Sequence, residues 1–273
     1  MAGPVRRAVV AGSWYPGNPQ ALRKDISRYL DKANIPEITA KPAAIIVPHA
    51  GYLYSGPVAA WAYKAISGRD YATVVVISPS HHAYFPYISV WPQGAYETPL
   101  GLVTVDHALC RRLLASEFIR DDTEPHSAEH ALEIQLPFLQ SVLQPFSLCP
   151  LVMGHQELSM CEALAQALHD SIQDPDNTLI VASSDLSHFH SANKAEKMDR
   201  QIAARIESFD IPGLSMDLEN AYSEACGGGP ILAALLYAGL LSRTTARVLR
   251  YAHSGSITGD NSSVVGYLSA VVY

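Results

Sequence analysis

Histidines stand at the ends of three short apolar runs in this chain. The runs cover residues 43–49, 73–78 and 178–183, and each is β-branched or leucine-rich. Such runs are typical of buried strands in a mostly parallel sheet. The polar residues at or just after their ends are His49, His81, His82, Asp185, His188 and His190. Because imidazole and carboxylate groups bind metal ions and transfer protons, these positions are the first candidates for chemistry.

These strand ends are expected to contribute to one shared site. In α/β sheets, ligands bind in the crevice outside the carboxyl ends of the strands, where the loops converge. A single histidine at a strand end is weak evidence, but three strands that end in this way favour a common pocket. His81 and His82 are neighbours on an extended segment and point to opposite sides. His82 is therefore expected to form a pocket wall or to support the site, and His190 is expected at the surface.

Cys226 is the cysteine best placed for chemistry. It precedes three glycines and the predicted start of a helix at 230–241. Glycine allows a ligand to approach the backbone closely, and a helix start offers free N–H groups and a positive dipole end. Both features favour a thiolate, which binds metal ions or attacks electrophiles. The alternative is a small buried thiol in a glycine-rich turn, and this is the interpretation for the other three cysteines, Cys110, Cys149 and Cys161.

The stretch "EPHSAEHALEIQLPFL" (124–139) is the other concentration of polar residues. Glu129 and Glu133 are four residues apart, as are His126 and His130, so each pair shares one face of a helix. Histidines at this spacing can bind a metal ion together. The alternative is a capped helix start with acidic residues near the positive dipole end, which we favour for Glu129. His130 and Glu133 stay candidates for the pocket, and Pro137 is expected to interrupt the helix.

Strands and helices alternate along the chain. Buried strands are predicted at 43–49, 73–78, 147–153 and 178–183, with two closing strands within 246–255 and 262–273. Helices are predicted at 56–67, 130–143, 161–172, 193–209 and 230–241. The pattern predicts a single α/β domain over residues 1–273, with a mostly parallel or mixed sheet flanked by helices.

Composition excludes several classes of protein. Of the 273 residues, 48% are hydrophobic and 16% charged, which is typical of a chain that buries a large core. The formal net charge is −7 and the basic residues are scattered, so we expect no nucleic-acid partner and no membrane partner. The N-terminal apolar stretch is too short for a signal peptide, and the four cysteines form no CxxC pair. The expected location is the cytoplasm.

Five motifs in order carry a resemblance to a known family. They are "PHAGYLYSG", "SPSHHAY", "EHALEIQLPFL", "SSDLSHF" and "ACGGGP", and the likeness extends from about "GSWYPG" to "GYLSAVV". The chain resembles the Memo family, whose fold is that of the class III non-haem iron extradiol dioxygenases. Prokaryotic members are often called the B component of an AMMECR1–Memo–radical SAM gene group, so a functional link to AMMECR1-like and radical SAM proteins is implied.

The resemblance also implies roles for particular residues. A divalent metal would be bound by His49, His81 and Cys226, with iron favoured and copper or zinc as alternatives. Asp185 and His188 would line the same pocket, His188 at the position of an acid–base histidine. Trp14 and Tyr54 would form aromatic pocket walls for a small-molecule or peptide ligand, together with His82, His130 and Glu133. Gly229 stands where animal members have a histidine, so no role of that histidine carries over.

Two functions from different classes follow. Dioxygenases bind Fe(II) through two histidines and a carboxylate, whereas a thiolate at Cys226 is softer and more easily oxidised, which argues against ring cleavage. The first hypothesis is therefore a metal-dependent oxidoreductase of unknown substrate in which His188 transfers a proton. The second is a non-catalytic binding or adaptor protein whose vestigial pocket accepts a phosphotyrosine-like or other anionic aromatic group. A zinc hydrolase is a third possibility.

Overall fold

Four parallel strands form the centre of the main sheet. The computed structural model describes residues 3–273, and the four central strands follow the order β2 (Ala44–Val47), β9 (Thr178–Ser183), β3 (Thr73–Pro79) and β8 (Ser147–Met153). Nearly all their residues are buried, as continuous apolar runs predict for strands covered on both faces. All four were predicted from the sequence, so the parallel centre of the sheet is confirmed.

Antiparallel strands extend the sheet on both sides. Strand β12 (Val264–Val272) pairs antiparallel with β2, and both β11 (Ala246–His253) and β10 (His188–His190) pair with β12. At the other side, β4 (Ile88–Val90) runs antiparallel to β8 and is followed by β7 (Ile119–Asp121). The sheet is therefore mixed, within a single α/β domain. A separate small sheet, which the sequence did not predict, joins β1 (Val5–Arg6), β5 (Ala95–Thr98) and β6 (Gly101–Thr104).

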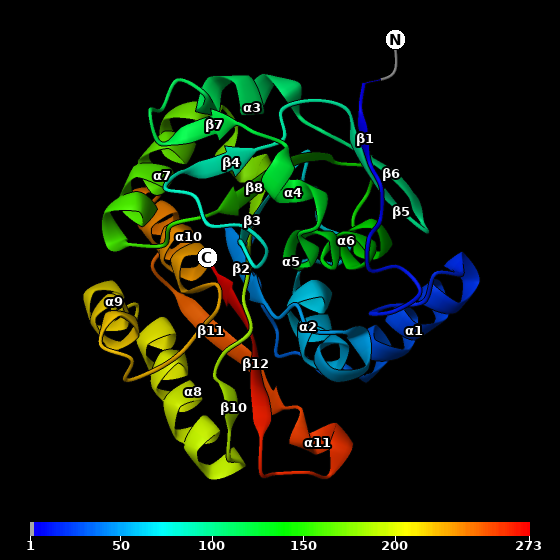
Figure 1. Cartoon of the computed structure of the whole chain (residues 1–273), viewed down its shortest axis with the longest axis vertical. Helices are drawn as coiled ribbons and strands as arrows, with labels where there is room; N and C mark the ends of the chain where they lie inside the picture. The colour runs from blue at the N-terminus through cyan, green and yellow to red at the C-terminus, as the bar shows by residue number, and fades with distance from the viewer. Residues whose placement is uncertain (1–2) are drawn as a thin grey trace.

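Helices cover both faces of the main sheet, as Figure 1 shows. On one face α10 packs on β2, β9 and β3 and against α7, while on the other α2 packs on β2 and β12 and α5 packs on β3. The helices are α1 (Pro19–Lys32), α2 (Tyr52–Ile66), α3 (His107–Leu113), α4 (Glu124–Ser127), α5 (His130–Glu133), α6 (Leu136–Val142), α7 (Leu158–Ser171), α8 (Ala192–Glu207), α9 (Ile211–Glu219), α10 (Gly228–Leu240) and α11 (Gly255–Thr258), with a 3-10 turn at Pro175–Asn177. Within residues 3–273, none of these is both long and apolar enough to span a lipid bilayer.

The predicted helix at 130–143 is broken into two short helices. Helix α5 ends at Glu133, and α6 begins at Leu136 with Pro137 in its first turn. Proline has no N–H to donate and is favoured at a helix start, so the expected interruption is confirmed. The break leaves Gln135 between the helices, where its side-chain amide donates to the Pro48 carbonyl and to the Ser183 hydroxyl. This position connects α5 and α6 to the ends of β2 and β9.

Candidate metal centre

Three histidines from three elements meet at the carboxyl ends of the central strands. His49 follows β2, His81 follows β3, and His130 begins α5; one ring nitrogen of each lies within 4.8 Å of the others. The ring centroids are 5.1 Å apart for His49 and His81, and 4.6 Å apart for His81 and His130. Because neutral imidazole nitrogens are common metal ligands, this arrangement could hold a divalent ion. His130, which the sequence suggested as a pocket residue and as a possible metal-binding partner of His126, belongs to this group.

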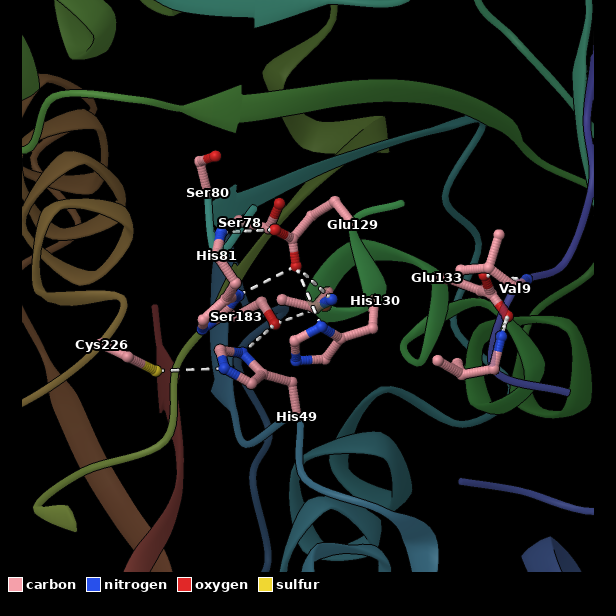
Figure 2. Close-up of polar contacts among 12 residues, drawn as sticks. Val9, His49, Ser78, Ser80, His81, Glu129, His130, Glu133, Ser183 and Cys226 are labelled. Atoms are coloured by element: carbon pink, nitrogen blue, oxygen red, sulfur yellow. Dashed lines mark hydrogen bonds and ion pairs between the residues drawn. The ribbon is translucent and has the colours of Figure 1, made fainter. Parts of the chain in front are cut away.

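Cys226 reaches the histidine cluster through His49. Its Sγ lies 3.1 Å from His49 Nε2, although 177 residues separate the two positions in the chain. In the view of Figure 2, the thiol and the His130 ring lie on opposite sides of the His49 ring. His49 thus contacts the other two histidines and Cys226, but among the described residues the group whose donor atoms all lie within 4.8 Å of one another consists of the three histidines.

A chain of hydrogen bonds fixes the tautomer of His49. Its Nδ1 is 2.9 Å from the Ser183 hydroxyl, which donates its only proton to the Ala131 carbonyl at 2.7 Å. The same hydroxyl accepts from Gln135 Nε2, and the orientation of that amide is set by the Tyr63 hydroxyl, which donates to Gln135 Oε1 at 2.7 Å. Ser183 can therefore only accept from His49, so Nδ1 carries the proton. Nε2 is therefore unprotonated, and its lone pair faces the Cys226 thiol at 3.1 Å.

Glu129 holds the other two histidines in place. One carboxylate oxygen is 3.0 Å from His81 Nδ1 and 3.5 Å from His130 Nδ1, and the other accepts from the His81 backbone N–H at 2.7 Å. Figure 2 shows this carboxylate above the imidazole rings. Burial acts to raise the pKa of Glu129, but the His81 ring and the N–H groups of Ala131 and His81 outweigh it and lower the pKa to about 2. An ionised carboxylate on Nδ1 leaves Nε2 of His81 available to an ion, as in many metal sites.

Burial keeps His49 and His130 neutral. Desolvation, followed by the neighbouring rings of His81 and His130, holds the pKa of His49 well below its ordinary value. Desolvation also lowers the pKa of His130 to about 4, against the opposing charge of Glu129. Neutral imidazoles keep the lone pairs that a metal ion requires.

Asp185 ties the loop of His49 to the segment of Cys226. Its carboxylate accepts from the backbone N–H groups of His49 at 2.7 Å and Ala50 at 3.3 Å, and its own N–H donates to Cys226 Sγ at 3.3 Å. Burial is the main cause that raises the pKa of this carboxyl to about 7, although the two N–H groups act in the opposite direction. Asp185 therefore positions the backbone around the centre and also lines its pocket.

The helix start beside Cys226 is not open to a ligand. The N–H of Gly227 donates to Ser184 Oγ at 2.9 Å, and that of Gly229 donates to Gln156 Oε1 at 2.8 Å. Burial, followed by the charge of Asp185, raises the pKa of the Cys226 thiol. In the protein without a bound cation, burial therefore acts against the thiolate that the sequence led us to expect at this helix start.

Two cavities open beside the centre and meet at His188. The first, of about 490 Å³, is lined by His49, His81 and His130 and walled by Trp14, Tyr54 and Tyr267. The second, of about 550 Å³, is lined by Cys226, Glu224 and residues of α9 and α10. His188 lines both cavities, and burial lowers the pKa of its ring. The predicted pocket residues Trp14, Tyr54, His130, Asp185 and His188 are thus brought together in the first cavity.

Other candidate residues lie outside the centre. Glu133 is fully buried and is bonded to Arg6, Tyr15 and the backbone of Val9 and Val10, so its carboxylate does not line the pocket. His126, which could have formed a pair with His130, shares a hydrogen bond of 2.6 Å between its Nδ1 and the Tyr96 hydroxyl instead. His82 is exposed, with its ring 5.9 Å from that of His130. His190 pairs with Glu224 at 2.9 Å.

Sequence reasoning missed the residues that orient the histidines. Glu129 was assigned to a helix cap, which it also is, because its side chain accepts from Ala131 N–H. Ser183 and Gln135 gave no signal, since neither type is a metal ligand. Glu224, which contacts both His190 and the His188 backbone N–H, lay in no motif. The one available hint for Glu129 was its place directly before His130.

Comparison with known proteins agrees with this architecture. An α/β sheet with histidines gathered at its strand ends defines the class of protein, and the family model described as Memo-like protein matches residues 6–271. The chain belongs to the Memo family. Curated relatives named MEMO1 family protein are 37% identical in Methanothermobacter thermautotrophicus (96% of this chain, 98% of the relative) and 38% identical in Sulfolobus acidocaldarius (97% and 98%). A MEMO1 family protein of Thermotoga neapolitana is 37% identical over 98% of this chain and 99% of its own.

Proposed function

We propose that this protein binds a divalent metal ion through His49, His81 and Cys226 and uses it in an oxidoreductase reaction. One observation carries the proposal: the free Nε2 of His49 lies 3.1 Å from the Cys226 thiol while Ser183 holds its Nδ1. A ligand whose second nitrogen is fixed by a hydrogen bond is the usual arrangement at protein metal sites. His130 is the alternative third ligand, since its nitrogen belongs to the same cluster.

The donor types suit a redox metal. Two or three imidazoles with one thiolate form a set that Fe(II), copper and Zn(II) accept, and we favour iron. When bound, such an ion supplies electron transfer or Lewis acidity at the floor of the 490 Å³ cavity. Trp14 and Tyr54 would bind the apolar part of a small-molecule or peptide ligand, because both wall this cavity.

His188 is the residue proposed to move a proton. It lines the cavity beside the histidine cluster, and its lowered pKa favours a neutral ring that can accept a proton. Glu224 fixes its position by accepting from the His188 backbone N–H at 3.4 Å. Asp185 would act by positioning, since its carboxylate binds the His49 loop.

The adaptor function ranks second on the geometry. Trp14 and Tyr54 do form aromatic walls, as an anionic aromatic ligand would require. The N–H groups of Gly227 and Gly229, however, are already bonded to Ser184 and Gln156. A phosphate or carboxylate would have to displace these bonds, so the helix start adds little to such a site.

The cytoplasmic location, the absence of a nucleic-acid partner and the link to AMMECR1-like and radical SAM proteins remain proposals.

Metal analysis of purified variants tests the proposal. Protein prepared without added metal is expected to contain iron, or else copper or zinc, at near one ion per chain. His49→Ala should remove most of it under either donor set, whereas loss in Cys226→Ala or in His130→Ala identifies the third ligand. His169→Ala, on the exposed face of α7, is the matched control and should keep full occupancy. Equal metal content in wild type, His49→Ala and the control would exclude this centre.

A variant of His188 separates proton transfer from metal binding. His188→Ala should leave metal content unchanged, because its ring is outside the group of clustered nitrogens, and should abolish any oxidation that the loaded protein performs. Both are measured on the same preparation, by metal analysis and by oxygen consumption with candidate reductants. Metal loss as large as that in His49→Ala would make His188 a ligand and overturn its role as an acid–base group.

A further inference from the structure

A basic groove borders the proposed metal-site pocket on the side of Tyr54. The groove has a volume of about 370 Å³ and lies among the end of α1, the first turns of α2, the end of β11 and α11. Figure 1 shows α2, β11 and α11 near the long strand β12, and α1 on the other side of α2. Tyr54 lines both the groove and the metal-site pocket, so it is the wall between them. The volume is at the lower end of the about 300–1,000 Å³ that small-molecule sites occupy.

The charges of the groove are of one sign. Lys32, Arg250 and His253 line it, and no aspartate or glutamate is among its lining residues within 3–273. In the same range, the side chains of Lys32 and Arg250 form no hydrogen bond and no ion pair. The nearest acidic contact is Glu196, 3.8 Å from Nε2 of His253. In a chain with a net charge of −7, two cations without a carboxylate partner in one groove favour an anionic ligand.

The backbone of β11 places Arg250 over the groove. The pairing of β11 with β12 shifts between Val248 and Arg250, which marks a β-bulge at Leu249. A bulge turns the following side chain to the other face of the strand, and here the Arg250 guanidinium lies 5.6 Å from the centre of the Trp61 ring. Contact with an indole face holds the guanidinium in place without neutralising it, so its donors stay available.

The remaining lining combines apolar surface with polar groups. Trp61, Pro57 and Ile257 supply apolar contacts, and Ser256 supplies a hydroxyl. His253 adds an imidazole ring to the lining. Together these features fit a molecule with an apolar body and one negatively charged end.

We propose that this groove binds an organic carboxylate, held by Lys32 and Arg250, at a site separated from the metal-site pocket by Tyr54. If the proposed function also holds, the natural ligand of the pocket carries a carboxylate that extends past Tyr54 into the groove. Carboxylate binding in the groove does not depend on metal binding, whereas the extension of the pocket ligand into the groove rests on the proposed function.

Three tryptophans allow the site to be located directly. Trp61 lines the groove, Trp14 lines the metal-site pocket, and Trp91 lines neither. Their indole N–H signals, assigned by single Trp→Phe variants, are followed by two-dimensional NMR of the full chain during titration with benzoate and with its neutral isostere benzamide. Benzoate should shift the Trp61 signal and leave Trp91 unchanged, with an affinity that falls as salt is added. Benzamide should shift Trp61 at least tenfold more weakly.

Matched variants test the assigned residues. The double variant Lys32→Gln/Arg250→Gln should weaken benzoate binding at Trp61 at least tenfold, whereas Arg247→Gln, an exposed arginine on the same strand, should not change it. Thermal unfolding and the unchanged Trp91 signal show that the double variant is folded. His49→Ala should lose metal and still bind benzoate at Trp61, which separates this proposal from the proposed function. A benzoate shift confined to Trp14, or one unaffected by the double variant, would overturn the groove as an anion site.

Discussion

Glu129 and Glu133 lie four residues apart and are both buried, yet they serve different parts of the molecule. Glu129 accepts from the His81 ring, 3.0 Å from its Nδ1, and from the His81 backbone N–H. Glu133 forms an ion pair with Arg6 and accepts from the Tyr15 hydroxyl at 2.6 Å and from two backbone N–H groups of the N-terminal segment. One carboxylate orients the proposed metal ligands, and the other anchors the N-terminal segment to α5.

The difference shows that burial and residue type do not by themselves define a functional carboxylate. Both side chains are at most 1% exposed. The two carboxylates differ in their partners. Glu129 contacts imidazoles that offer a second nitrogen to an ion, whereas Glu133 contacts a guanidinium, which has no lone pair to offer. Arg6 joins the two regions, because it also donates to the Glu129 carbonyl at 2.6 Å. The Arg6–Glu133 ion pair is therefore connected to the site through the Glu129 backbone, although it takes no part in the proposed chemistry.

The largest effect is expected from Glu133→Ala, on stability. It leaves the Arg6 guanidinium buried without its counter-ion, which costs about 3–5 kcal/mol in comparable buried pairs. Denaturant unfolding measures this loss, and metal bound per folded chain should stay as in the wild type. A loss below about 1 kcal/mol, or metal loss without loss of stability, would contradict the division between the two glutamates.

Glu129→Gln should instead act mainly on metal affinity and less on stability. The amide can still cap α5 but no longer offers an ionised oxygen to His81, so metal affinity should fall about 10–100-fold. The free energy of unfolding should fall by less than in Glu133→Ala, since the glutamine side chain can still accept from the N–H of Ala131 or of His81. Metal titration in a competing chelator and denaturant unfolding, done on both glutamate variants, give the comparison. Unchanged affinity would remove Glu129 from the site.

Ser183→Ala tests the tautomer of His49 with a smaller expected effect. Without the hydroxyl, Nδ1–H loses its acceptor and the ring can adopt the other tautomer or rotate, so metal affinity should fall about tenfold. Ser187→Ala is the matched control, because the Ser187 hydroxyl is buried without a hydrogen-bond partner in the described part of the chain. Equal metal affinity in the two serine variants would show that Ser183 does not orient His49.

The smallest expected effect is a pH dependence of stability that arises from His126, a residue bonded to Arg6. Burial lowers the pKa of His126 to about 3, and Arg6 Nε donates to its carbonyl at 3.0 Å. Below its ordinary pKa the unfolded chain takes up a proton that folded His126 cannot bind, so stability falls as pH decreases from about 6.5 towards about 3. Between about pH 7.5 and 5.5, protonation of this histidine in the unfolded chain lowers the free energy of unfolding by about 1 kcal/mol. Thermal and denaturant unfolding should show that the stability of His126→Gln decreases less than that of the wild type over this pH interval. An identical decrease in both proteins would assign the pH dependence to other groups.

The parts of the fold that could be predicted are those with a strong local sequence pattern. The four central strands were predicted because long apolar runs such as Val74–Ile77 have one stable location, the covered centre of a sheet. The small sheet of β1, β5 and β6 was missed, because its strands are two to four residues long and β6 is largely exposed. Such strands form through their partners and not through their own composition.

The positions of the candidate ligands along the chain could be predicted from local patterns: His49 and His81 follow apolar runs, and Cys226 precedes a glycine-rich helix start. The interruption of a helix at Pro137 was predictable in the same way. Which side chains meet depends on the tertiary structure. Glu129 contacts His81 across 48 residues, Ser183 contacts His49 across 134, and Cys226 contacts His49 across 177. Contacts at such separations depend on how helices pack on the sheet, and local residue patterns contain no information on that packing.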